Sequence, residues 1–202
     1  YRAALRYLRE LNIDPMPFSI ACKNEIPLAR GLGSSAAAIV GGMLGASALA
    51  GEKDPDMEGL LRLAADMEGH PDNVTAALFG GCQIVVKEWG KLVHAAVPIP
   101  EELRAVLFIP DAPTSTREAR QVLSDSVSRD DAVYNMSRVA LLVNALGTGR
   151  TDIFPVAIQD RLHQPAREKL FPSMRLFFRS ALNAGALGVF LSGAGPTILA
   201  LT

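Results

Sequence analysis

The chain has 202 residues, of which 49% are hydrophobic and 20% charged, and its formal net charge is −1. This is the composition of an ordinary globular protein, and the length is ample to bury a core in one large or two small domains. A charge near zero excludes the broad basic field that attracts nucleic acid or anionic lipid, so we expect neither a nucleic-acid nor a membrane partner.

The first hundred residues predict helices joined by a few strands. Phe18, Ile20 and Cys22 alternate with polar or small residues, as in a half-buried strand. We expect Cys22 and Cys82 to be small buried hydrophobes within strands, in a reducing, cytosol-like compartment. The expected elements are helices at about 1–11, 34–50 and 58–67, a strand at about 18–24, and a hairpin formed by about 83–86 and 92–97.

The most apolar window of the chain is 36–50, where Gly41 and Gly45 form a GxxxG pair. In a membrane this spacing favours helix dimerisation. The window is too short to span a bilayer, so we expect a buried helix that packs closely on a sheet.

Two prolines, Pro98 and Pro100, mark the best candidate boundary between domains. Beyond it, Ala-Val-Leu-Phe-Ile at 105–109 predicts a buried strand. Helical patterns follow at about 130–147 and 173–184, and strands at 187–191 and 198–201 flank the turn Ser192-Gly-Ala-Gly-Pro-Thr197. Helices and strands do not alternate steadily, which favours an α+β fold over α/β.

A strand followed by a Gly/Ser turn and a long helix is typical of a phosphate site. The helix N-terminus offers free N–H donors, and glycine lets the backbone approach an anion. Residues 27–36, here called the phosphate turn, fit this description, with Ser34 or Ser35 placed to cap the helix. The alternative is that these serines are only a cap. A P-loop is excluded because no lysine precedes the final serine. A dinucleotide fingerprint would have glycine where Ala36 stands and an acidic residue further on, so a nicotinamide dehydrogenase is disfavoured.

The phosphate turn, Pro-Leu-Ala-Arg-Gly-Leu-Gly-Ser-Ser-Ala, resembles the PxxxGLGSSA signature of the GHMP kinases (galactokinase, homoserine kinase, mevalonate kinase and phosphomevalonate kinase). Ser192–Thr197 resembles the second glycine-rich motif of the same family. The resemblance implies a two-domain α+β kinase, with residues 1–100 as a partial N-terminal ATP-binding domain and 101–202 as a partial C-terminal domain. It implies that ATP is held by Pro27, Leu28, Ala29, Arg30, Gly31, Leu32, Gly33, Ser34, Ser35 and Ala36.

Three further segments resemble the homoserine-phosphorylating branch of this family. They are Glu68–Gly81 with its His-x-Asp-Asn core, Ser115–Arg120, and Gln164–Arg167 followed by Leu170–Pro172, where Gln164 replaces a common glutamate. The implied reaction is the ATP-dependent phosphorylation of the side-chain hydroxyl of L-homoserine to O-phospho-L-homoserine, a step of threonine biosynthesis.

Phosphoryl transfer depends on positioning and on charge stabilisation, and Mg²⁺ prefers hard oxygen ligands. By resemblance, Mg²⁺ is held by Glu68 and by Ser35, or alternatively Ser34. The carboxylate of homoserine requires a cation, and the guanidinium groups of Arg120 and Arg167 suit it.

By the same resemblance, His70 and Gly193 also contact the substrate. Asn73 stands where mevalonate kinases have a catalytic aspartate, so orientation does the catalytic work and the acceptor hydroxyl is deprotonated late. The alternative is that Asp72 acts as a general base. Asp72, Asn73 and Arg120 are therefore the candidate catalytic residues, and all three also belong to the expected substrate site.

Two other functions remain open at this point. One is a kinase of the same family for another small alcohol, such as mevalonate or diphosphocytidyl-methylerythritol, and the other is a non-catalytic nucleotide-binding module. Family members begin with a strand segment that has no match here, and they continue after Thr197 with a further helix and strand. We therefore expect an internal fragment with weak or no turnover by itself, from a cytoplasmic enzyme that is plausibly a homodimer.

Overall fold

The computed structural model describes residues 1–14, 17–111 and 116–202. These residues form two compact units, which are described separately. Unit 1 comprises Tyr1–Ile26 and Gly33–Val97, and unit 2 comprises Pro27–Leu32 and Pro98–Thr202. The main division falls at the proline-rich stretch expected as a boundary, and the first part of the phosphate turn, residues 27–32, belongs to unit 2.

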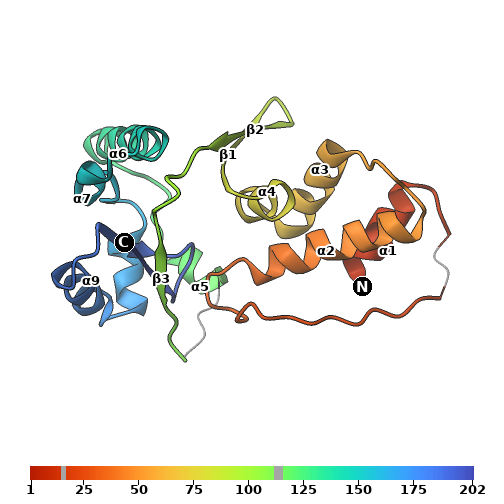
Figure 1. Ribbon diagram of the computed structural model, residues 1–202, viewed down its shortest axis with the longest axis horizontal. Helices are drawn as coiled ribbons and strands as arrows, with labels where there is room; N and C mark the ends of the chain where they lie inside the picture. Colours follow the sequence, from red (N-terminus) through yellow and green to blue (C-terminus); the bar gives the residue numbers. More distant parts are fainter. Residues whose placement is uncertain (15–16, 112–115) are drawn as a thin grey trace. The chain divides into compact units, whose positions relative to one another are not determined.

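Unit 1 is built on four helices, α1 (Arg2–Glu10), α2 (Ser34–Leu49), α3 (Met57–Glu68) and α4 (Asp72–Phe79). Helix α2 packs against the other three (Figure 1). Apolar residues repeat at helical spacing along α1 and α3, so each helix turns one face inward. Among the largest fully buried side chains of this core are Leu8, Met43, Leu60, Leu61, Leu63 and Val74.

Tyr7 lies at the edge of this core, with its ring buried and its hydroxyl 2.8 Å from Oε2 of Glu52, to which it donates a hydrogen bond. Burial, together with the hydrogen bond and the negative charge of Glu52, raises the pKa of Tyr7 to about 12. The contact ties α1 to the residues that follow α2.

The predicted hairpin is confirmed. Strands β1 (Cys82–Glu88) and β2 (Lys91–Val97) pair antiparallel, and Trp89 and Gly90, both with positive φ, make the turn. The hairpin follows directly on α4, and the ring of His94 on β2 stacks on Phe79 at 4.2 Å between centroids.

Two expectations for unit 1 are wrong. Residues 17–26 are extended but form no strand, because no strand among the described residues pairs with them, and Cys22 is exposed rather than buried. Helix α2 packs on helices and not on a sheet. Its Gly41 and Gly45 are open to a cavity of about 750 Å³ that residues 18–26 also line, and a Cβ on either glycine would contact nothing within 4 Å.

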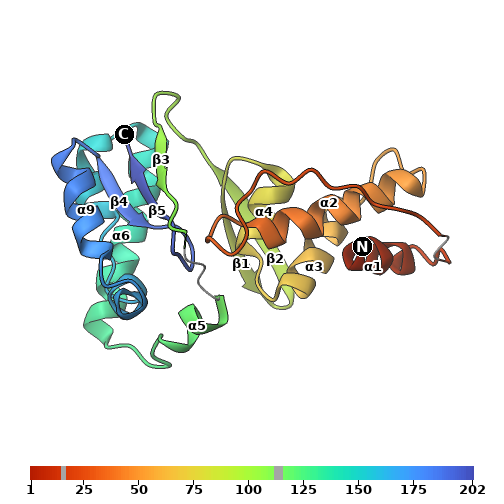
Figure 2. The ribbon, with the colours of Figure 1, turned by 90° about the horizontal axis from the view of Figure 1, so that it is seen from below.

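Unit 2 contains a three-stranded antiparallel sheet in the order β3 (Ala105–Phe108), β5 (Ile198–Leu201), β4 (Gly188–Leu191). Helix α9 (Met174–Asn183) packs against β4 and β5 (Figure 2). Their shared core holds Met174, Ala181, Val189, Leu191, Ile198 and Ala200. The prediction that β3 is buried is wrong: all four of its residues are exposed, because β3 is an edge strand of the described sheet.

The remaining helices of unit 2 connect these strands. The long α6 (Arg129–Thr148) begins at Ser128, whose hydroxyl accepts a hydrogen bond from the N–H of Asp131 at 3.0 Å. The short elements are α5 (Thr116–Gln121), η1 (Thr151–Ile153), α7 (Phe154–Ala157), α8 (Gln164–Arg167) and η2 (Glu168–Leu170). Helices and antiparallel strands are thus mixed, which confirms the α+β prediction. Within the described ranges, no helix combines the length and apolar character needed to cross a bilayer.

Candidate functional site

The N-terminus of α2 is shaped by a glycine and not by a serine. Gly33, with φ +72°, is the residue that precedes the helix, and its carbonyl accepts from the N–H of Ala37 at 3.0 Å. Among the residues that the structure describes, no side chain caps the helix, so the prediction that Ser34 or Ser35 does so is wrong; both serines are already helical. The first N–H groups of the helix therefore keep no side-chain partner, which is the arrangement that receives an anion.

The side chain of Ser35 turns instead to the end of α3. Its Oγ donates to Oε2 of Glu68 at 2.6 Å, although the two residues are 33 positions apart in the chain. Two ligands at right angles on Mg²⁺ lie about 2.9 Å apart, given metal–oxygen distances of about 2.0–2.1 Å. The two oxygens of Ser35 and Glu68, 2.6 Å apart, would therefore need to separate only slightly to bind one Mg²⁺ together.

The described residues contain no group of three or more His, Cys, Asp or Glu side chains that could hold a metal ion. A Mg²⁺ at Ser35 and Glu68 would thus complete its shell with water and phosphate oxygens. Mg²⁺ in phosphate-transfer sites is commonly bound in this way, by one or two carboxylates.

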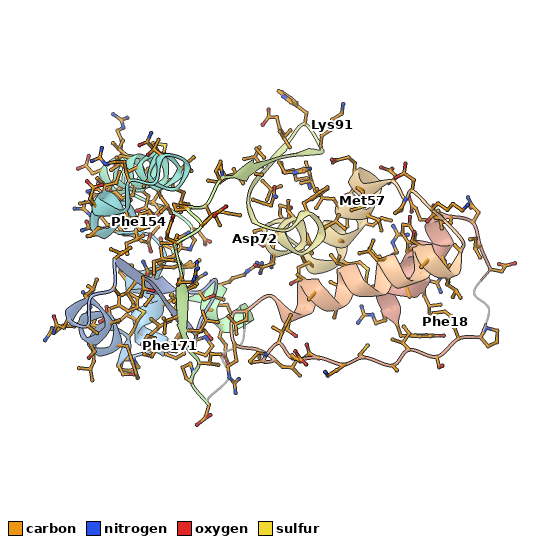
Figure 3. All side chains as sticks on the ribbon, viewed as in Figure 1. Phe18, Met57, Asp72, Lys91, Phe154 and Phe171 are labelled. Atoms are coloured by element: carbon orange, nitrogen blue, oxygen red, sulfur yellow. The ribbon has the colours of Figure 1, made fainter. Side chains whose placement is uncertain are left out.

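The loop between α3 and α4 carries further predicted residues and leads to Asp72 at the start of α4 (Figure 3). Gly69, with φ +87°, ends α3 and lets the chain turn. Nδ1 of His70 lies 2.5 Å from Oδ1 of Asp72, and the same oxygen accepts from the N–H of Asn73 at 2.7 Å. The side chain of Asn73 lies beside Gly33, since a Cβ on that glycine would be 3.8 Å from Cγ of Asn73.

In unit 2, the first part of the phosphate turn contacts the turn 192–197, here called the glycine turn. Oγ of Ser192 donates to the Gly31 carbonyl at 2.8 Å, and the N–H of Thr197 donates to the Arg30 carbonyl at 3.3 Å. The guanidinium of Arg30 donates to the carbonyls of Leu28, Ala29 and Asp111. The two motifs that the sequence identifies, 161 residues apart at this contact, are therefore neighbours in space.

Gly31 sits at the tightest point of that contact. A Cβ there would lie 2.4 Å from the Ser192 carbonyl oxygen and 2.8 Å from the Gly195 carbonyl oxygen. Its φ of +72° also favours glycine. The glycine at this position is required by both conformation and space.

Arg167, on α8, is engaged by the backbone. Its Nε donates to the Ala119 carbonyl at 3.2 Å and its Nη1 to the Gly193 carbonyl at 2.7 Å. Burial lowers the pKa of Arg167, with the nearby charge of Asp160 opposing and that of Arg120 adding to the effect. Arg120 itself lies exposed in the last turn of α5, and Ser115, which the sequence places in the same motif, lies outside the described residues.

The structure thus gathers the predicted residues into two sets. In unit 1, Ser35 of the phosphate turn contacts Glu68 and Gly33 lies beside Asn73, while His70 and Asp72 contact each other close by in the chain. In unit 2, residues 27–32 of the same turn lie with the glycine turn, and Arg167 connects that turn to α5.

Sequence reasoning missed Asp160, whose partly buried carboxylate accepts four hydrogen bonds. The donors are the side-chain amide of Asn135 and the N–H groups of Leu162, His163 and Gln164. Burial opposes the ionisation of Asp160, but these hydrogen bonds outweigh it and hold its pKa below the ordinary value. An aspartate just before the Pro-containing helix α8 is the signal that marks such a capping role.

Comparison with known proteins matches both ends of the chain to one family. Residues 1–81 match the model of the GHMP kinases N terminal domain, and residues 143–202 match that of the GHMP kinases C terminal domain. A homoserine kinase from Caldicellulosiruptor bescii is 45% identical over 201 residues, and one from Thermosynechococcus vestitus is 44% identical over 202. Both alignments cover 100% of this chain.

The alignments cover 65% of the first relative and 67% of the second, so the chain spans about two thirds of the length of the curated relatives that it matches. Among solved structures, the homoserine kinase from Cytophaga hutchinsonii is 33% identical, with a TM-score of 0.85 over 99% of this chain and 64% of that one. With both motifs in place and both family models matched, the chain belongs to the GHMP kinase family.

Proposed function

We propose that the protein uses ATP to phosphorylate the side-chain hydroxyl of L-homoserine, giving O-phospho-L-homoserine for threonine biosynthesis. The observation that supports this proposal is the contact between Ser35 and Glu68 at the N-terminus of α2, which places a candidate pair of magnesium ligands beside a candidate phosphate site. The relatives named homoserine kinase, at about 45% identity, support the choice of acceptor.

The nucleotide is assigned to the phosphate turn. The backbone N–H groups of residues 33–36 and the positive end of the α2 dipole receive the ATP phosphates, while Pro27–Leu32 continue the same turn. Ser35 and Glu68 hold the Mg²⁺, which neutralises charge on the phosphates when it is bound. Residues 1–100 then correspond to the ATP-binding domain and 101–202 to the C-terminal domain, in line with the two family-model matches.

The acceptor is assigned to side chains of suitable charge. Arg120 and Arg167 provide cations for the homoserine carboxylate. Arg167 donates from Nε and Nη1 to carbonyls, and within the described part of the chain no hydrogen bond engages its Nη2, which can serve a ligand. Gly193 contributes backbone to the same substrate. His70, held by Asp72, and Asn73 orient the hydroxyl that accepts the phosphoryl group.

The role of a general base separates two versions of this mechanism. If orientation by Asn73 suffices, Asp72→Asn leaves the pH profile of kcat unchanged, although kcat falls because His70 loses its partner. If Asp72 is the base, its replacement lowers kcat by orders of magnitude, and the residual activity lacks the acid limb of that profile.

The test is a turnover assay on the longest natural chain that contains these residues. ADP release is measured with ATP and a panel of alcohols that includes homoserine, mevalonate and diphosphocytidyl-methylerythritol, and ³¹P NMR identifies the product. Homoserine is expected to be the preferred acceptor. Preference for another alcohol would overturn the choice of substrate, and nucleotide binding without any turnover would indicate a binding module.

Weakening of the proposed metal site should impair catalysis. Glu68→Gln is expected to lower kcat by about 100-fold and to raise the Mg²⁺ concentration needed for half-maximal rate, because a neutral amide is a weaker ligand. Glu58→Gln, on the same helix and paired with His94 at 3.1 Å, is the matched control and should stay near wild type. Excess chelator should stop both the wild type and the control.

A homodimer and a cytoplasmic location remain part of the proposal.

A further inference from the structure

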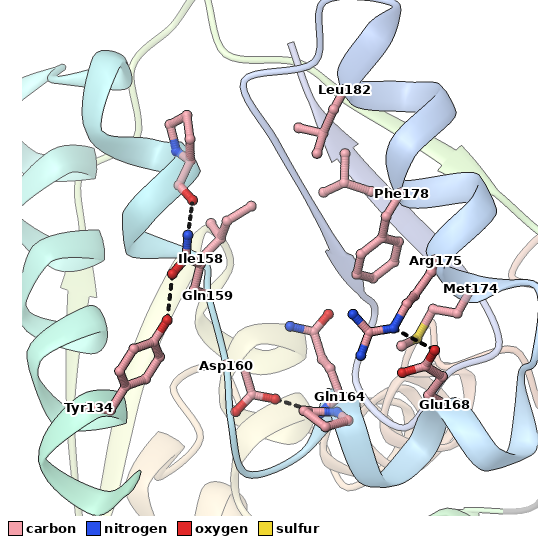
Figure 4. A pocket seen from close by; sticks show the side chains of 13 residues that line it. Tyr134, Ile158, Gln159, Asp160, Gln164, Glu168, Met174, Arg175, Phe178 and Leu182 are labelled. Atoms are coloured by element: carbon pink, nitrogen blue, oxygen red, sulfur yellow. Dashed lines mark hydrogen bonds and ion pairs between the residues drawn. The ribbon is translucent and has the colours of Figure 1, made fainter. Parts of the chain in front are cut away.

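Residues 160–164, here called the anchor loop, connect α7 to α8 and are organised around one carboxylate. Oδ1 of Asp160 accepts from Nδ2 of Asn135 at 2.7 Å and from the N–H of Leu162 at 2.8 Å. Oδ2 accepts from the N–H groups of His163 and Gln164, the latter bond being drawn in Figure 4. Asn135 also accepts from the N–H of Arg161 at 3.0 Å, so the loop is fastened to α6 at two points.

From this loop, two side chains lead to the glycine turn. Oε1 of Gln164 accepts from the N–H of Leu191, the last residue of β4, at 3.0 Å. Three residues further along α8, Nη1 of Arg167 donates to the Gly193 carbonyl. Leu191, just before the glycine turn, and Gly193, within it, are therefore both held by residues of α8, and the start of α8 is positioned by the anchor loop.

The glycine turn in turn contacts the phosphate turn. It is closed by the N–H of Ser192 on the Thr197 carbonyl and the N–H of Gly195 on the Ser192 carbonyl, both at 2.8 Å. Ser192 and Thr197 then donate to the carbonyls of Gly31 and Arg30. Every link from α6 to Gly31 lies within unit 2.

We propose that Asp160 is a positioning residue for nucleotide binding, which acts through the anchor loop and the glycine turn on residues 30–31 of the phosphate turn. The proposal rests on the function assigned above only in that the ligand is ATP. The carboxylate of Asp160 accepts hydrogen bonds from four donors. Its two oxygens can serve all four, whereas no neutral side chain of the same size can.

The decisive variant is Asp160→Asn, which keeps the shape and replaces one oxygen by an NH₂ group that faces two donors. The full natural chain is examined by amide hydrogen exchange and by calorimetric titration with ADP. We expect exchange at Ser192, Gly195 and Thr197 to accelerate at least about tenfold, and the Kd for ADP to rise by about tenfold.

Two further variants separate positioning from general damage. Asp152→Asn, an exposed aspartate paired with Arg150 in the same unit, is the matched control and should alter neither readout. The double variant Asn135→Asp, Asp160→Asn again pairs a carboxylate with an amide, with the two groups interchanged. It should recover at least part of the ADP affinity that the single variant loses.

Each outcome decides a separate point. Unchanged exchange in the glycine turn of Asp160→Asn would overturn the inference whatever the activity, and so would faster exchange with unaltered ADP affinity. Failure of the wild type to bind any nucleotide would refute the proposed function, while the exchange data would still show whether Asp160 holds the turn.

Discussion

A methyl group at position 31 would meet two backbone oxygens of the glycine turn, at 2.4 and 2.8 Å, and neither can rotate away as a side chain would. Gly31→Ala also carries the cost of a positive φ, about 1 kcal/mol. Gly149→Ala is a matched control, because Gly149 has φ +70° but no atom within 4 Å of a Cβ. We expect Gly149→Ala to lower the free energy of unfolding by about 1 kcal/mol and Gly31→Ala by at least about 3 kcal/mol. Urea denaturation measures both, and equal losses would show that the contact with the glycine turn carries no weight.

At the scale of elements, α1 is tied to the rest of unit 1 by the hydroxyl of Tyr7. Its pKa is raised from 10.0 to about 12, so the proton is held more tightly in the folded state. The stabilisation is fully present below pH 10 and is lost as pH rises through about 12. Tyr7→Phe should cost about 1 kcal/mol at pH 8. The difference between this variant and the wild type should shrink between pH 10 and 12.

Chemical denaturation at pH 8, 10 and 11.5 checks this prediction. Glu52→Gln, which keeps an acceptor but removes the charge, should weaken the dependence on pH. A difference between Tyr7→Phe and wild type that is constant over this range would contradict the assigned cause.

Elements also show how far sequence patterns reach. The helices at 34–50, 58–67 and 130–147 and the hairpin were predictable because their periodicity and turn residues are local. The strand expected at 18–24 and the burial expected for β3 failed because both depend on neighbouring strands, which local pattern does not specify.

The candidate site divides in the same way. The phosphate turn and the glycine turn are continuous motifs, and the sequence identifies both. The contact of Ser35 with Glu68 spans 33 positions, and the sequence indicated it only through family resemblance. Asp160 was missed because its role comes from Asn135 and from the Gln164–Leu191 contact, 25 and 27 positions apart.

At the scale of the whole molecule, β3 forms an edge of the sheet in unit 2, as far as the described residues show, and this suggests a prediction about association. Val106, Leu107 and Phe108 on β3 are all exposed, and an exposed apolar edge strand is a template for pairing with another chain. We expect the 202-residue chain to self-associate as its concentration rises, and Val106→Lys to reduce this. Sedimentation velocity is the measurement. Val93→Lys, on the exposed face of β2, is the control and should leave association unchanged; an equal effect of both variants would rule out a specific role for β3.

The assignment of residues 27–32 to unit 2 has a consequence for recombination between relatives. A chimera with a single crossover at Val97 would combine Arg30 and Gly31 from one parent with the glycine turn from the other. The contacts between these two segments would then join residues of different parents. A cassette that carries 27–32 together with 98–202 keeps these partners together. The module that these contacts define in this chain is therefore discontinuous, and chimeras with three junctions should retain nucleotide binding more often than those with one.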